Sequence, residues 1–153
     1  MIEIEIPGRS ALHLEHLVLD VNGTLARDGL LMADVLPRLR DLKHQITIHV
    51  LTADTHGRQA SIDAQLGMTA HIISSGGEKA DYVTNLGPAS VVAIGNGAND
   101  AAMCKVAGLG IAVLGPEGLA ASLLREADVL VGDIACGLDL LLYPARLRAT
   151  LRA

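Results

Sequence analysis

Short apolar runs alternate with segments of helical periodicity along the chain, and this alternation limits the fold more than any other feature. The runs are apolar on both faces, as is typical of strands buried in a parallel sheet. The expected strands comprise residues 16–21, 46–51, 69–73, 91–94, 109–113 and 128–131, after a half-buried N-terminal hairpin at 2–6 and 11–15. The expected helices comprise residues 34–44, 56–66, 78–86, 100–107, 118–125 and 134–151, the last broken at Pro144. The order predicts an α/β fold of three layers, with helices on both faces of a mostly parallel, Rossmann-like sheet.

The composition indicates one globular domain. The chain has 153 residues and no linker or repeat, so we expect a single domain over residues 1–153. Half of the residues are hydrophobic but Phe and Trp are absent, so the core must consist of Leu, Val, Ile and Ala. The formal net charge of −5 and the scarcity of aromatic residues argue against a nucleic-acid partner.

The sequence shows no membrane or secretion signal. No apolar run approaches the roughly 20 residues that span a bilayer. The first residues alternate charged and apolar side chains, unlike a signal peptide. Cys104 and Cys136 are isolated, as is typical of reduced thiols inside the cell. We therefore expect a cytoplasmic protein with no membrane partner.

The first buried strand ends on a carboxylate. In Leu-Val-Leu-Asp-Val-Asn-Gly-Thr-Leu, residues 17–25, the apolar run stops at Asp20 and the turn signal Asn22-Gly23 follows. Ligands collect at the carboxyl ends of parallel strands, so Asp20 is a candidate site residue. An Asp that only caps a turn by binding local backbone amides would give the same sequence.

Polar side chains follow four of the expected buried strands, and all should face one crevice. They are Asp20 and Asn22, Thr52 and Asp54, Lys79, and Asn96, Asn99 and Asp100. Hard oxygen ligands suit Mg²⁺. A hydroxyl, an ammonium and the backbone amides of a Gly-rich turn suit a phosphoryl group. A carboxylate in such a site can act as a nucleophile and form an aspartyl-phosphate.

Four segments resemble, in order, the motifs of the haloacid dehalogenase (HAD) superfamily. They are Asp-Val-Asn-Gly-Thr-Leu from Asp20, Leu-Thr-Ala-Asp up to Asp54, Lys79, and Gly-Asn-Gly-Ala-Asn-Asp up to Asp100. The best local likeness is to the phosphorylation domain of P-type ATPases, whose motifs read Asp-Lys-Thr-Gly-Thr, Thr-Gly-Asp and Gly-Asp-Gly-x-Asn-Asp. The resemblance implies a HAD-like fold and, without a transmembrane segment, a soluble, stand-alone relative of that domain.

The resemblance also implies a role for each matched residue. Asp20 would be the nucleophile, Thr52 would bind the phosphoryl group, and Lys79 would offset negative charge. The phosphate cradle would comprise Thr52 and Lys79 with the backbone at Gly23, Thr24 and Ala53. The implied Mg²⁺ ligands comprise Asp20, the backbone carbonyl of Asn22, Asn96 and Asp100.

Two residues depart from the HAD pattern. Asn22 stands where phosphatases carry a general-acid Asp, and an amide can neither protonate the leaving group nor deprotonate water. General acid–base catalysis is typically worth about 10²–10⁴-fold. Asn96 replaces an Asp of the Mg²⁺ pair, which removes a charge from the site. We therefore expect weaker Mg²⁺ binding and slow turnover. P-type ATPases have Thr at the position of Asn22, so this loss slows dephosphorylation rather than abolishing transfer to Asp.

Several of these residues have a structural alternative. Lys79 could be a surface lysine, and Asp100 or Asn99 could cap the helix that follows. Asp54 could be a substitute acid at the mouth of the crevice, but an N-cap of the next helix is the favoured interpretation.

The gaps between the motifs are too short for the cap domain with which many HAD phosphatases choose substrates. The leading hypothesis is a capless, magnesium-dependent phosphatase that acts on a phosphorylated small molecule or phosphoryl donor. The alternative is a catalytically impaired regulatory or binding module for a phosphorylated ligand or protein, and a weaker third is a phosphoryl-accepting partner of a transport system. We also expect a homo-oligomer, because an open crevice can be closed by a neighbouring subunit.

Overall fold

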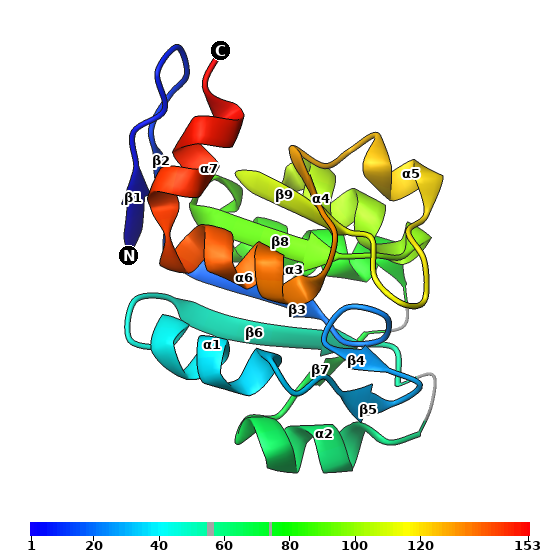
Figure 1. The fold of residues 1–153 in the computed structure, drawn as a ribbon. Coiled ribbons are helices and arrows are strands. Elements are labelled where there is room, and N and C mark those ends of the chain that lie inside the picture. The colour runs from blue at the N-terminus through cyan, green and yellow to red at the C-terminus, as the bar shows by residue number, and fades with distance from the viewer. Residues whose placement is uncertain (55–56, 74) are drawn as a thin grey trace.

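The computed structural model describes residues 1–54, 57–73 and 75–153. Within these residues, a six-stranded parallel sheet forms the centre, in the order β10-β9-β8-β3-β6-β7 (Figure 1). Its strands are β3 (His16–Asp20), β6 (Thr47–Thr52), β7 (His71–Ile72), β8 (Val91–Gly95), β9 (Leu109–Val113) and β10 (Val129–Val131). The predicted parallel α/β sheet is confirmed.

Helices cover both faces of the sheet, as predicted (Figure 1). One face carries α1 (Val35–Leu42), α2 (Gln59–Leu66), α6 (Ile134–Leu142) and α7 (Pro144–Leu151), and the other carries α3 (Gly76–Leu86), α4 (Ala101–Val106) and α5 (Ala121–Leu124). Successive side chains of a strand point to opposite faces. On β3, Leu17 and Leu19 join the core under α1 and α6, whereas Val18 joins the core under α3 and α4. Both faces of the central strand are therefore dry, which explains its continuous apolar run.

Two small antiparallel hairpins flank this sheet. The N-terminal hairpin pairs β1 (Ile2–Ile4) with β2 (Leu12–Leu14) and buries Ile2 and Ile4 while Glu3 stays exposed, which confirms the predicted half-buried strand. The second hairpin pairs β4 (Ala26–Arg27) with β5 (Leu30–Leu31), around the predicted turn at 27–29. Two short 3₁₀ turns, η1 (Pro88–Ser90) and η2 (Ala98–Asp100), precede β8 and α4.

Some helix ends differ from the prediction for local reasons. The chain at Gly118 has a φ of 88° and bridges back to Gly115, so α5 begins at Ala121 rather than at 118. Helix α3 begins two residues early, because the Ser75 side chain accepts a hydrogen bond from the backbone of Glu78 and caps it. Helix α2 begins at Gln59, and its predicted start near residue 56 lies outside the described residues.

The segments between the strand ends are short. Only the β4–β5 hairpin and α1 lie between β3 and β6, and only α2 and β7 lie between β6 and α3, so the described chain carries no cap domain in either gap. None of the helices in the described ranges is long and apolar enough to cross a bilayer.

Candidate functional site

Three neighbouring strands end at the candidate site. Asp20 is the last residue of β3, Thr52 the last of β6 and Gly95 the last of β8, and β3 pairs in parallel with both other strands. The sheet thus brings together the carboxylate, the hydroxyl and the Gly-rich turn that the sequence places at strand ends.

A buried lysine joins two carboxylates at this edge. Lys79, in the first turn of α3, donates to Asp20 Oδ1 at 2.6 Å and to Asp100 Oδ1 at 2.7 Å. The exposed fractions of Lys79, Asp20 and Asp100 are 0%, 4% and 0%, so this Lys is not a surface residue. One ammonium between two carboxylates leaves a net charge of −1 that water scarcely screens, provided all three groups are ionised.

Burial changes the proton affinity of these groups. Burial, and then the nearby charge of Asp100, raises the pKa of Asp20 from 3.8 to about 7, although Lys79 and Thr24 act in the opposite direction. Burial alone would lower the pKa of Lys79, but the two carboxylates outweigh it and raise that pKa above its ordinary value. Lys79 therefore stays charged, and Asp20 is the group that takes up a proton to relieve the excess negative charge.

Asp100 holds the Gly-rich turn as well as the lysine. Its Oδ2 accepts hydrogen bonds from the backbone amides of Asn96 at 3.1 Å and Gly97 at 2.9 Å. It therefore binds the loop before η2 and does not cap α4 with its side chain. Gly95 makes room for it, because a Cβ there would lie 2.5 Å from Asp100 Cγ. In the sequence, the only signal for this role of Gly95 is its place at a strand end before a Gly-rich turn.

Thr24 connects the nucleophile candidate to Asn96. Its hydroxyl lies 3.2 Å from both Asp20 Oδ2 and Asn96 Oδ1, and its single proton can serve only one of them at a time. The amide nitrogen of Asn96 donates to the Gly118 carbonyl at 3.0 Å, which leaves the amide oxygen to accept from Thr24. The sequence predicted only a backbone role for Thr24.

The oxygens around Thr24 suit a hard cation. They combine one carboxylate, one amide oxygen held in place by Gly118, and the adjacent Asn22 turn, next to a net negative charge. Mg²⁺ typically binds one or two protein carboxylates and completes its shell with water and phosphate oxygens. In the part of the chain that the structure describes, no three His, Cys, Asp or Glu side chains form a metal cluster. The donors named above are all oxygen atoms, whereas Zn²⁺ sites typically use thiolate and imidazole ligands, so this donor set fits Mg²⁺ better than Zn²⁺.

Thr52 is fixed as a hydrogen-bond acceptor on its protein side. The backbone N–H of Asp54 donates to Thr52 Oγ1 at 2.9 Å, and the Asn22 amide approaches it at 3.4 Å. Because these contacts use only the acceptor lone pairs of the hydroxyl, Thr52 can donate its proton to another group. The Asp54 carboxylate accepts from the Gln59 amide at 3.3 Å, at the first residue of α2, close to the N-cap interpretation. Ala53 is exposed beside them.

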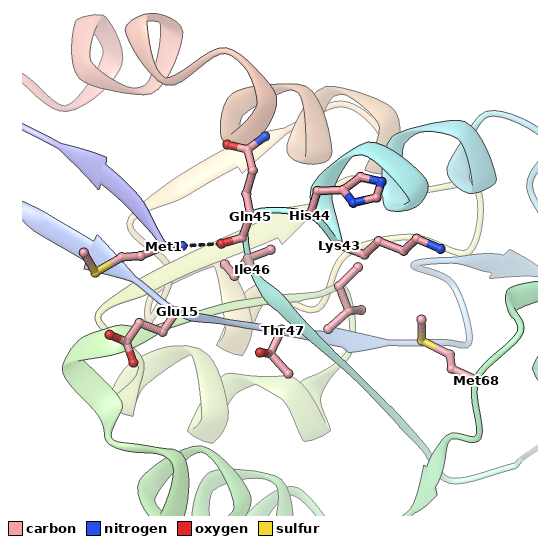
Figure 2. Close-up of a pocket in the computed structure, with 9 residues that line it drawn as sticks. Met1, Glu15, Lys43, His44, Gln45, Ile46, Thr47 and Met68 are labelled. Carbon is pink, nitrogen blue, oxygen red and sulfur yellow. Dashed lines mark hydrogen bonds between the residues drawn. The ribbon is translucent and has the colours of Figure 1, made fainter.

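A separate pocket of about 610 Å³ lies at the opposite edge of the sheet, where β3 and β6 begin (Figure 2). The Met1 amino group donates to the Gln45 carbonyl there, and Glu15 and Lys43 point away from each other. These ionic side chains are exposed and do not converge, so we assign no chemistry to this pocket.

Comparison with curated proteins identifies one family member. No protein-family description matches the chain. An uncharacterised protein of Methanocaldococcus jannaschii is 48% identical to it over 62 residues, which cover 40% of this chain and 67% of that protein. The chain belongs to the same family as this archaeal protein.

Comparison with solved structures confirms the resemblance to the HAD superfamily. A protein described as a HAD superfamily (subfamily III A) hydrolase from Legionella pneumophila has a TM-score of 0.71 and 21% identity, over 90% of this chain and 87% of that one. The 3-deoxy-D-manno-octulosonate 8-phosphate phosphatase of Moraxella catarrhalis has a TM-score of 0.70 and 20% identity, over 92% and 94%. A zinc-transporting PIB-type ATPase has a TM-score of 0.64 and 28% identity over 78% of this chain, but the match covers only 20% of that ATPase. The chain therefore has the capless HAD fold.

Replacing Gly95 should displace the Asp100 side chain that packs against it. In Gly95→Ala the new methyl group collides with Asp100, and we expect a loss of about 1–3 kcal/mol in the free energy of unfolding, measured with urea. Gly132→Ala is the matched control, because a Cβ there meets no atom within 4 Å, and it should change stability by less than about 0.5 kcal/mol. Equal stabilities of the two variants would contradict this account of Gly95.

The raised pKa of Asp20 predicts a pH-dependent effect of Asp20→Asn on stability. Between about pH 4 and 7, native Asp20 holds a proton that the unfolded chain has lost, so rising pH destabilises the metal-free wild type. Asp20→Asn lacks this cost and should be more stable at pH 7 by on the order of 1–3 kcal/mol, with the advantage disappearing near pH 4. Asp41→Asn, on the exposed side of α1, is the control and should show no such trend. A wild type more stable than Asp20→Asn at pH 7 would refute this assignment.

Proposed function

We propose that the chain is a phosphoryl hydrolase that acts through an aspartyl-phosphate on Asp20. The observation that carries the proposal is the buried contact of Lys79 with Asp20, at the end of β3, and with Asp100, in the η2 turn that follows β8. A fixed buried cation beside a strand-end carboxylate is what an in-line attack on a dianionic phosphoryl group needs, because it offsets the charge that the two anions bring together.

The reaction has two steps on this chain. A carboxylate oxygen of Asp20 bonds to phosphorus as the bond from phosphorus to the leaving oxygen breaks. Water then bonds to phosphorus, the Asp20–phosphorus bond breaks, and inorganic phosphate leaves. Thr52 donates its free hydroxyl proton to the phosphoryl oxygens, and the backbone at Gly23, Thr24 and Ala53 cradles them.

Mg²⁺ is the cofactor that we propose. Asp20, the Asn22 carbonyl and Asn96 would hold it, with Asp100 acting through the loop that it binds. The ion would neutralise phosphate charge when bound. The Moraxella relative in fold was solved with magnesium and phosphate, and a related phosphatase from Haemophilus influenzae with cobalt.

The two Asn residues favour slow turnover and support a second candidate. At position 22 an amide faces Thr52, and at position 96 an amide faces Gly118, where phosphatases of this superfamily carry carboxylates. A module that only binds a phosphorylated ligand or protein would need the phosphate-binding residues but not the general acid that Asn22 replaces. The likeness to the zinc-transporting ATPase supports, more weakly, a phosphoryl-accepting partner of a transport system.

The open crevice bears on substrate and assembly. We take a phosphorylated small molecule as the substrate class, in a cytoplasmic protein. The β4–β5 hairpin exposes 62% of Leu30, which supports a homo-oligomer in which a neighbour meets this hairpin. Light scattering at micromolar concentration tests the assembly, and a monomer would exclude it.

Hydrolysis of aryl and acyl phosphates with Mg²⁺ tests the function. We expect slow turnover by the wild type, none by Asp20→Asn, and a rate raised by at least about 10-fold in Asn22→Asp, because a carboxyl group there restores acid–base catalysis. Asn22→Ala removes the amide without adding an acid and should not raise the rate. Turnover by the wild type no faster than by Asp20→Asn would reject the enzyme and favour the binding module.

A further inference from the structure

Three histidines from neighbouring strands lie on the face of the sheet that α3 covers. His16 is the first residue of β3, His49 lies within β6, and His71 is the first residue of β7. His49 pairs with Val18, which belongs to the core under α3. His71 pairs with Leu51, which belongs to the same core. Since side chains two residues apart on a strand share a face, His16 lies on the same side of the sheet as Val18.

A chain of hydrogen bonds joins two of these histidines to α3. His16 Nδ1 lies 3.1 Å from His49 Nε2, and His49 Nδ1 lies 2.9 Å from the Tyr82 hydroxyl. The Tyr82 ring also packs against His71, with 5.0 Å between the ring centroids. Both ring nitrogens of His49 are therefore engaged, one with β3 and the other with the helix. We call His16, His49 and Tyr82 the His–Tyr chain.

The His–Tyr chain can hold only one extra proton. In the contact between His16 and His49 one nitrogen donates and the other accepts, whereas a protonated imidazole donates from both of its nitrogens. One charged ring is compatible with this contact. Two charged rings would point two N–H groups and two positive charges at each other, so the second protonation must break the contact.

The groups around His49 oppose its protonation. The titratable groups that face it are His16 from β3, His71 from β7 and Tyr82 from α3. Burial, and then the charges of His16 and His71, lowers the pKa of His49 below its ordinary value of 6.5. The neutral form of His49, which the hydrogen bonds of the chain require when His16 is charged, is therefore favoured at neutral pH.

Helix α3 carries both the end of the His–Tyr chain and the buried cation of the candidate site. Lys79 lies one turn before Tyr82 and binds Asp20 on β3, while the Tyr82 hydroxyl joins the same helix to β6. The acidic residues Glu78 and Asp81 of this helix are exposed, where water screens their charges. A change in the His–Tyr chain thus acts on the helix that positions Lys79.

We propose that the His–Tyr chain is a proton-operated clasp on α3. At neutral pH it ties the helix to β6 and steadies the position of Lys79. At acidic pH His16 and His49 are both protonated, the contact between them breaks, and the charged His49 ring turns toward water and leaves Tyr82. The second half of α3 then loosens. The clasp responds to pH whether or not the site hydrolyses phosphate, so it does not depend on the proposed function.

Amide hydrogen exchange in the Asp20→Asn background tests the clasp, because this background removes the titration of Asp20 beside Lys79. Between pH 7 and 5, after correction for intrinsic exchange rates, we expect the protection of residues 82–86 to fall about 5-fold relative to α6, the factor that one hydrogen bond typically contributes. Adding His49→Gln or Tyr82→Phe should make this protection independent of pH, because each removes one link of the chain. His44→Gln removes an exposed histidine outside the chain and should behave as the background does.

NMR titration of the His49 ring in the same background is a second measurement that needs no change in the clasp itself. The midpoint should lie below 6.5, and it should rise in His16→Gln, which removes a neighbouring charge. A midpoint at or above 6.5 would overturn the clasp, as would an equal loss of protection in His49→Gln and in the background. An equal loss in α6 would show that the whole domain is destabilised rather than α3 released, and would also overturn it.

Discussion

The buried ion pairs of Lys79 are the constraint on which the rest of the site depends. An ammonium with no exposed surface is stable only where carboxylates surround it, and here Asp20 comes from β3 and Asp100 from η2. Because Asp100 also binds the amides of residues 96 and 97, the lysine fixes the Gly-rich turn as well as the nucleophile candidate. One side chain of α3 thus sets the positions of two strand ends.

The Asn residues alter this arrangement without removing it. Asn96 lacks the charge of an Asp but donates a hydrogen bond to Gly118, which ties the loop before α5 to the site. Asn22 places an amide that faces Thr52 at the position where phosphatases of the HAD superfamily carry a general acid. Both features favour a well-ordered phosphate cradle over rapid turnover, which agrees with the slow phosphatase that we propose.

The sequence predicted the sheet and the strand-end residues because both depend on local signals. Apolar runs such as 17–19 mark dry strands, and polar residues just after them must meet at one edge. Contacts between distant segments leave no such signal. That Gly95 makes room for Asp100 and that the Thr24 side chain joins Asp20 to Asn96 depend on the packing of loops that lie far apart in the chain. Helix α5 was misplaced because the turn at Gly118 precedes it.

The central claim is that Asp20 accepts a phosphoryl group, and intact-protein mass spectrometry after acid quenching tests it directly. Incubated with an acyl phosphate and Mg²⁺, the wild type should gain the mass of one phosphoryl group, and hydroxylamine should remove it, since it cleaves acyl phosphates. Peptide mapping should place the adduct on Asp20. A wild type that gains no such mass, or an adduct that persists in Asp20→Asn, would contradict the account.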